Sequence, residues 1–536
     1  MTELYRKDHR LITKRIIVRG TLVLDTPTCL GTGDADSPTD LPLLRDSLDD
    51  KYALLTGSSI AGALRNYLRE RNKGYGKSDR RYDSAALLFG DLFSYKDEQN
   101  ITDEVERIKL REQDTQSPLI INDAISTKPI QSELRDGVKI NSITRTAVDK
   151  AKYDLELLQA GTEFPLGFEL LIEKNDNEQQ LIKALALALQ GLEPNNSSKS
   201  GEISLGMKKR RGFGRCHVKE WQVWNFDLTD ASDRTAWLKF EHWRTGLFPE
   251  ISSYSSIKDA FTQANINKVD FDELEKEDKR DRFTINATFN LASPLLIRSG
   301  QAETGRAPDV VHLKSHRPKK ESENEPDPSQ QNLVPIISGT SLAGVLRHRA
   351  ERIVKTLQCS FGQNPECDEE PEIVQCIFGD VNKKRSQASR LIVHESTINH
   401  TTDLVQTRIA IDRFTGGAYH GALFQEQPVF ANNDNKLELK LELRNPKEHE
   451  IGLLLLLLKD LWTEDLPVGG SSSVGRGRLK GKEAKMTWKD STWEIKQNGD
   501  DSLEITPESD KEKLKDYVSE LVKYIKENNN NEQSNS

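Results

Sequence analysis

Two similar loops carry carboxylates that could act as a general base or hold a divalent cation. The first loop contains Asp34, Asp36 and Asp40, and the second contains Asp309. When the loops are aligned on their glycines, Asp40 and Asp309 occupy matching positions before an apolar stretch. An isolated loop aspartate is also a common first residue of an Asx turn. The pattern therefore allows either a catalytic or a structural aspartate in each loop.

Three cysteines and a histidine in the second half of the chain make up a possible metal site. His348 is followed by Cys359, Cys367 and Cys376, and three Cys with one His form a closed tetrahedral ligand set for zinc. Seven and eight residues separate the successive cysteines, whereas zinc sites usually have about two to four between paired ligands. The residue types predict structural zinc, and the spacing leaves a metal-free alternative open.

Two short motifs at predicted helix starts could bind phosphate. Each has a glycine followed by hydroxyl side chains, with an arginine further along the helix. The N-terminus of a helix offers free N–H groups and partial positive charge to an anion, although hydroxyls there are also ordinary helix caps. Neither motif is a Walker A loop, because the Gly-Lys-Ser/Thr sequence is missing. The residues concerned are Ser58, Ser59 and Arg65 in the first motif and Thr340, Ser341 and Arg347 in the second.

Two glycine-rich loops carry clustered cations. Glycines let a backbone approach a ligand closely, and cations neutralise successive phosphates. A solvated turn after a helix would have the same composition, so that alternative stays open. The cations are Lys208, Lys209, Arg210, Arg211 and Arg215 in the first loop and Arg476 and Arg478 in the second.

These motifs recur because the chain is a tandem repeat. Six blocks match in the same order: an alternating strand, a Gly-Ser/Thr-Ser helix start, Phe-Gly-Asp, Ser-x-Leu-Ile, Arg-x-x-x-Asp-Arg/Lys and a glycine-rich loop. Ordered matches of this kind indicate a duplicated domain. The fifth block aligns Arg145 and Lys150 with Arg408 and Arg413 at a spacing of 263 residues.

Within each copy the elements run strand, loop, helix, further strands, leucine-rich helix and glycine-rich loop. This β-α-β-β-α-β order predicts an α+β protein of two tandem ferredoxin-like domains, the frame that RNA-recognition domains also use. The expected divisions are a first domain at 11–225, a connector at 226–280, a second domain with insertions at 281–485 and an acidic tail at 486–536. Apolar residues at helical spacing predict an amphipathic helix at 508–527, which could dock on this chain or on a neighbour.

The charge balance excludes a uniformly basic nucleic-acid coat. The 536-residue chain has 76 Lys and Arg against 85 Asp and Glu, a net charge of −9, so its basic loops are local features. The N-terminal segment has no apolar signal sequence. The longest apolar run, Ile451–Leu458, is eight residues long and too short to cross a bilayer. We expect a cytoplasmic protein without a disulfide framework.

The ordered motifs resemble the RAMP superfamily of CRISPR proteins over both repeats. They are most similar to the backbone subunits of type III effector complexes, here with two copies fused in a type III-D-like arrangement. The resemblance implies a prokaryotic ribonucleoprotein in which subunits stack along a guide RNA, with a large polymerase-like subunit among the partners. It also implies that a loop aspartate cleaves the paired target RNA, which carries over to Asp40 and Asp309, with Asp34 and Asp36 as rivals. Cations of the matched motifs would contact the RNA backbone, and related subunits carry zinc near the position of these cysteines.

Cleavage of this kind would use the target's own 2′-hydroxyl as nucleophile, with Mg²⁺ or Mn²⁺ as the expected metal. One alternative is a scaffold that binds guide RNA with both loop aspartates purely structural. Another is a guide-processing endonuclease of the same superfamily, which would need a histidine base. His312 and His420 are the histidines near matched motifs that could serve.

Overall fold

The protein's structure is a computed structural model that describes most of the chain. The described residues are 11–32, 40–77, 83–91, 103–105, 108, 115–194, 199–266, 269–299, 308–317, 333–362, 369–381, 386–499 and 502–533. Within these residues no helix has the length and apolar character needed to span a membrane.

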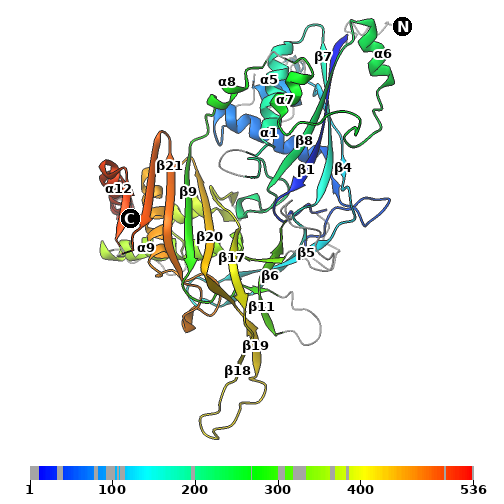
Figure 1. Ribbon diagram of the computed structural model, residues 1–536. Coiled ribbons are helices and arrows are strands. Elements are labelled where there is room, and N and C mark those ends of the chain that lie inside the picture. Colours follow the sequence, from blue (N-terminus) through cyan, green and yellow to red (C-terminus); the bar gives the residue numbers. More distant parts are fainter. Residues whose placement is uncertain are drawn as a thin grey trace.

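The first domain is an antiparallel sheet with two helices packed on one face (Figure 1). Its sheet has the order β3-β7-β1-β8, as expected for a β-α-β-β-α-β fold. Alternate residues of its first strand, including Ile16, Val18 and Leu22, belong to the same buried cluster as the apolar sides of both helices. Its elements are β1 (Ile12–Leu24), α1 (Gly57–Lys73), β3 (Leu119–Ile121), β7 (Glu163–Glu173), α5 (Glu178–Gln190) and β8 (Cys216–Asp227).

The second domain repeats this arrangement, which confirms the predicted duplication and fold class. Its central strands have the equivalent order β16-β20-β9-β21. Further strands extend the sheet on both sides. The core elements are β9 (Arg282–Leu291), α9 (Gly339–Ser360), β16 (Leu391–Val393), β20 (Val429–Arg444), α11 (Glu448–Trp462) and β21 (Leu479–Trp488). The added strands are β12 (Lys314–His316), β13 (Leu333–Ile337), β17 (Ser396–Asp403), β22 (Ser491–Gln497) and β23 (Leu503–Thr506).

Each domain also carries a hairpin between its second and third core strands. The first hairpin consists of β5 (Ser132–Ile140) and β6 (Ala147–Leu158), and the second of β18 (Gln406–Arg408) and β19 (Phe424–Gln427). The loop of the second hairpin projects from the body of the molecule (Figure 1). The remaining short elements are β2 (Leu54–Leu55), α2 (Ser84–Phe89), β4 (Ala124–Ile125), β10 (Arg298–Ser299), β11 (Val310–His312), α10 (Glu372–Phe378), β14 (Asp380–Val381) and β15 (Ser386–Gln387).

The connector packs on both faces of the first domain. Its first helix, α6 (Ala231–Lys239), lies on the opposite side of the sheet from α5 (Figure 1). There the ring of Trp224 in β8 contacts those of Phe240 and Phe248, each at a centroid distance of 5.1 Å. The helices α7 (Ile257–Gln263) and α8 (Phe271–Lys276) return to the helical side, where Phe261 and Leu274 join the core.

The C-terminal helix docks on this chain. It runs as α12 (Lys511–Gln533), a little further than the predicted 508–527. Leu514, Tyr517, Leu521 and Ile525, which form its apolar stripe, are buried in the core of the second domain. A Cβ on Gly452 of α11 would meet the carbonyl oxygen of Tyr517 at 2.1 Å, so the two helices pack with their backbones close together. Of the two docking sites that the sequence allowed, this chain or a neighbour, the helix therefore occupies the one on this chain.

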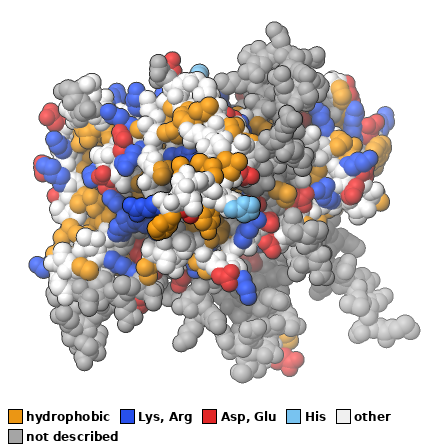
Figure 2. Space-filling model, turned by 90° about the horizontal axis from the view of Figure 1, so that it is seen from below, with side chains coloured by type: hydrophobic (Ala, Val, Ile, Leu, Met, Phe, Trp, Pro, Cys, Tyr) orange, Lys and Arg blue, Asp and Glu red, His pale blue; other side chains and the backbone are white. Residues whose placement is uncertain are grey.

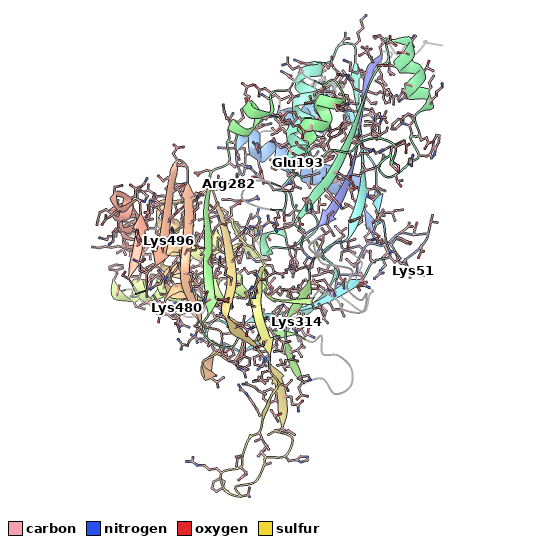
Figure 3. The ribbon with its side chains drawn as sticks, in the orientation of Figure 1. Lys51, Glu193, Arg282, Lys314, Lys480 and Lys496 are labelled. Atoms are coloured by element: carbon pink, nitrogen blue, oxygen red, sulfur yellow. The ribbon has the colours of Figure 1, made fainter. Side chains whose placement is uncertain are left out.

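Ion pairs join the two domains. Glu202 of the first domain accepts from Arg280 at 2.7 Å and from Arg282 at 3.2 Å, and Arg282 lies where the domains meet (Figure 3). Arg444 of β20 pairs with Glu70 of α1 at 3.1 Å. Because these partners are partly buried, their mutual attraction is screened less than that of fully exposed pairs.

Candidate nucleic-acid interface

The two loop aspartates make the same contact in both repeats. Asp40 Oδ2 accepts a hydrogen bond from the backbone N–H of Asp154 in β6 at 2.8 Å. Asp309 Oδ2 accepts from the N–H of Gln425 in β19, also at 2.8 Å. Both aspartates are exposed, and their second carboxylate oxygens bond to no residue that the structure describes. The geometry therefore fixes one oxygen of each carboxylate and leaves the other open.

Neighbouring backbone contacts support this equivalence. The residue after each aspartate forms a parallel bridge to the hairpin, Leu41 to Leu155 in the first repeat and Val310 to Glu426 in the second. The rival carboxylates Asp34 and Asp36 lie outside the described residues.

The hairpin tips are also equivalent, but in a different register from the one that the sequence suggested. Asn141 Oδ1 accepts from the N–H groups of Ile143 and Thr144. Asp412 Oδ1 accepts in the same way two and three residues further on, from Phe414 and Thr415. Strand pairing agrees, because Ile140 bridges to Ala147 and Ile411 to Ala418. The spacing between the hairpins is therefore 271 residues.

This spacing corrects the predicted match of Arg145 and Lys150 with Arg408 and Arg413 at 263. The structural equivalent of Arg145 is Gly416: both adopt positive φ, 58° and 66°, and the amide of each donates to the first carbonyl of its turn. Exposed hairpin residues have no core partners to fix their order, so a local sequence likeness gave the wrong register. Arg145, Lys150 and Arg413 are nevertheless exposed on the hairpins, and Arg408 is half-buried.

Each tip presents a large apolar side chain to solvent. The exposed fraction is 55% for Ile143 and 98% for Phe414 at the matching position. Seen from the end where the second hairpin projects, apolar side chains gather on the surface with Lys and Arg beside them (Figure 2). Exposed apolar side chains next to cations are suited to stacking on unpaired bases while the cations neutralise phosphates.

The first glycine-rich loop divides its cations between two environments. Arg211 donates to the carbonyls of Leu391 and Phe378 in the second domain, and burial lowers its pKa to about 10. Lys209 and Arg210 line the same interdomain cleft of about 1200 Å³ as Arg211, but their side chains form no ion pair with a described residue. Arg215 also lines this cleft, with its guanidinium 3.2 Å from the ring of His394. Lys209 and Arg210 are therefore the cations of this loop that are most available to an anion.

The second glycine-rich loop has the same backbone and different side chains. The short 3₁₀ helices η2 (Lys209–Arg211) and η3 (Ser472–Val474) are each preceded by a left-handed residue, Lys208 with φ 53° and Ser471 with φ 59°. Arg476 is buried against Glu426 at 2.7 Å, whereas Arg478 is exposed and donates to a backbone carbonyl.

The two Gly-Ser/Thr-Ser helix starts are capped within the protein. Thr56 Oγ1 accepts from the N–H of Ser59, and the N–H of Gly57 donates to Asp123 at 2.6 Å. At the second start, the Ser338 hydroxyl accepts from the N–H of Ser341 at 3.2 Å. These contacts occupy donors that a phosphate would need.

The accompanying arginines and hydroxyls differ between the two starts. Arg347 forms a two-pronged pair with Glu370, whereas Arg65 has no hydrogen bond to a described residue. The hydroxyl of Ser58 is exposed, and that of Thr340 is half-buried beside Ser338. Arg65 is thus the arginine of this pair that is still available to a ligand.

The proposed zinc ligands do not assemble within the described residues. His348 and Cys359 lie on the same continuous helix, α9, and eleven residues of α-helix extend about 16 Å. One zinc ion, with bonds of about 2.0–2.3 Å, cannot bind both. Cys376 is on α10, Cys367 lies outside the described residues, and no group of three His, Cys, Asp or Glu side chains in the described chain could hold a metal. The geometry thus separates His348 from Cys359.

The two histidines considered as bases lie in unlike places. His312 is buried, accepts from the N–H of Ile297 and bonds to the carbonyl of Ile336. Burial lowers its pKa to about 4. His420 is exposed in the second hairpin loop. A buried histidine with both nitrogens engaged cannot reach a substrate proton, so the structure gives His312 a packing role.

Comparison with known families agrees with the duplicated fold. The family model described as RAMPs, the RAMP superfamily, matches residues 21–217 and again 288–480. The chain therefore belongs to the RAMP superfamily, with one family domain in each repeat. None of the curated proteins matches the chain. The family assignment indicates a CRISPR-associated RNA-binding subunit that works within a complex.

Proposed function

We propose that the chain is a backbone subunit of a type III CRISPR effector complex, which binds guide RNA and cleaves the paired target RNA at each repeat. The observation that carries the proposal is the repeated bond from a loop aspartate to a hairpin amide, through Asp40 and Asp309. This bond places one exposed carboxylate beside each hairpin, and the hairpin tips expose Ile143 and Phe414.

The chemistry follows from these positions. Stacking of a target base on an apolar tip would hold nucleotides out of the guide duplex and free the backbone to bend. The open oxygen of the aspartate could then accept the proton of a 2′-hydroxyl at about 2.6–3.2 Å. The resulting 2′-oxygen would attack the adjacent phosphorus to form a 2′,3′-cyclic phosphate, and the 5′-oxygen of the next nucleotide would leave and take up a proton from water. As an alternative to this role as base, the open oxygen of each aspartate could hold Mg²⁺ or Mn²⁺, which would supply charge stabilisation at the phosphate.

Lys209, Arg210 and the exposed hairpin cations are proposed to neutralise phosphates of the guide. The protein would then recognise backbone and shape, while base pairing between guide and target supplies sequence specificity. The expected partners are guide RNA, target RNA and the other subunits of the effector, including the large polymerase-like subunit.

A second function, as a non-catalytic guide-binding scaffold, has one observation in its favour. Each aspartate already accepts a backbone amide, which is an ordinary structural role for a loop aspartate. The two functions predict different behaviour of the same variants.

Purification of the assembled complex provides the test. Its bound RNA should be a short repeat-derived guide, and a complementary target should be cut at two positions. Asp40→Ala should remove one product and Asp309→Ala the other, each without loss of guide. Asp149→Ala, at an exposed aspartate of the first hairpin, is the matched control and should leave both products. Full cutting by both single variants would establish the scaffold.

A further inference from the structure

The two repeats differ at a pair of contacting buried residues beside the loop aspartate. In the first repeat, Leu155 and Phe213 pack in a small apolar cluster. In the second, the equivalent residues are Glu426 and Arg476, with exposed fractions of 0% and 4% and an ion pair of 2.7 Å. Removing two charges from water is expensive, and apolar residues can often replace a buried pair without loss of stability. Folding stability alone therefore does not account for the ion pair.

Glu426 also holds a second arginine that reaches the surface. Its Oε2 lies 3.0 Å from Nε of Arg408, whose side chain is 35% exposed. Arg476 already balances the charge of Glu426, so the cluster of one carboxylate and two guanidinium groups has a net charge of +1. Arg408 is cross-strand from Phe424, the residue before the amide that binds Asp309. The cluster thus presents a fixed cation beside the second aspartate.

The first repeat places a cation beside the equivalent hairpin residue, but through a different contact. The structural equivalent of Arg408 is Gly137, and a Cβ there would meet the ring of Tyr153 at 2.1 Å. Lys208 lies over this ring, with Nζ 3.7 Å from its centroid. Tyr153 is again the residue before the amide that binds the aspartate. Both repeats therefore hold one cation next to that amide, by cation–π contact in one and by a buried carboxylate in the other.

We propose that Glu426 is a positioning residue of the second site, which holds Arg408 against the scissile phosphate beside Asp309. The inference rests on the proposed function, because it assigns this cation to the same cleavage reaction. A long side chain at the surface samples many rotamers, and an ion pair with a buried carboxylate keeps its guanidinium in one place. A cation fixed in advance stabilises the extra negative charge that develops on the phosphate during attack. Lys208 has the corresponding place in the first repeat.

The test compares three changes in the full chain within the guide-loaded complex. These are Arg408→Ala, the pair Glu426→Leu with Arg476→Phe, and all three substitutions together. The pair installs the apolar residue types of the first repeat, so the core should still fold; Glu426→Gln is a second, single-residue variant. The rates of the two cuts are measured on one target, so that the cut set by the first repeat is an internal control for folding and guide binding.

We expect Arg408→Ala to slow the second cut by about tenfold to a hundredfold, the effect of one charge-assisted hydrogen bond. The Glu426→Leu/Arg476→Phe pair should slow the same cut by several-fold and should add nothing in the Arg408→Ala background, because it acts through Arg408. Arg408→Ala should also lower the salt slope of duplex binding by roughly one counter-ion, whereas the pair should not, since Arg408 keeps its charge.

Three outcomes would overturn the inference. The first is a pair variant that cuts normally at the second position while Arg408→Ala does not. The second is an equal loss at both positions, which would indicate general destabilisation. The third is an effect of the pair that persists undiminished in the Arg408→Ala background. If the wild-type complex made neither cut, the proposed function itself would be refuted, and that result is distinguishable from all three.

Discussion

Substitution of the loop aspartates by asparagine separates catalysis from structure, because the two roles depend on different properties of the carboxylate. Asp40→Asn keeps an oxygen that can accept the N–H of Asp154, now 2.8 Å from Asp40 Oδ2, and removes the basic group. Asp40→Ala removes both. Asp309→Asn and Asp309→Ala form the same series on the N–H of Gln425.

The magnitudes of the two effects are far enough apart to decide between them. One hydrogen bond at an exposed site is worth about 1 kcal/mol, which is less than a tenfold change in a rate or an equilibrium. Loss of a general base typically slows a reaction by about 10²–10⁴-fold. If Asp40 is catalytic, the asparagine and alanine variants should both lose the first cut by at least about a hundredfold.

The assay is single-turnover cleavage of an end-labelled target by the guide-loaded complex, with Asp149→Asn as a matched control. The cut set by the other repeat reports on assembly in the same reaction. Near-normal cutting by Asp40→Asn, with a modest loss in Asp40→Ala, would refute the catalytic role. It would show that the carboxylate only accepts the hydrogen bond that positions the hairpin.

Three further predictions concern binding, pH and metal. The double variant Lys209→Ala/Arg210→Ala should weaken RNA binding and lower its salt slope by roughly two counter-ions, measured by titration at several salt concentrations. The control variant Arg211→Ala should instead lower the melting temperature, because Arg211 bonds to carbonyls of the second domain. An unchanged salt slope in the double variant would show that the loop serves packing alone. Burial lowers the pKa of His312 to about 4 and that of His394 to about 3, so the unfolded chain binds more protons than the folded protein below about pH 6.5. The stability that these neutral histidines contribute is therefore present above that pH, and the melting temperature should fall as the pH drops toward 4. A melting temperature that did not fall over this range would contradict the prediction. Elemental analysis of protein purified without chelator should find one zinc per chain that is lost in Cys376→Ser and kept in at least one of His348→Ala and Cys359→Ser, since α9 holds His348 and Cys359 too far apart for one ion. Absence of zinc from the wild-type protein would refute the metal site.

The repeat and the fold could be predicted from the sequence because their signals come from buried residues. Strands such as β9 have an apolar residue at every second position, and burial of that side of the sheet in the core requires this spacing. The equivalence of Asp40 and Asp309 was predictable for a related reason, since each precedes an apolar residue that pairs with a hairpin strand.

The hairpins were harder to align from the sequence, because their exposed residues have no packing partners. The useful signal was the Asx-turn residue at each tip, Asn141 and Asp412, followed three residues later by a threonine. The replacement of the apolar contact between Leu155 and Phe213 by the ion pair of Glu426 and Arg476 could not be predicted from the sequence. Its two positions are far apart in the chain, and only the fold brings them together.

A target RNA with a single 2′-deoxyribose tests whether this one chain sets two cuts in guide-paired RNA. The target is prepared in three forms, with all ribose or with deoxyribose at one or the other mapped cut. Each deoxy substitution removes the nucleophile at one position only. We predict that it abolishes that cut and leaves the other at its normal rate. Two cuts that both persist on the deoxy targets would refute this two-site mechanism, because the 2′-hydroxyl would then not be the attacking group.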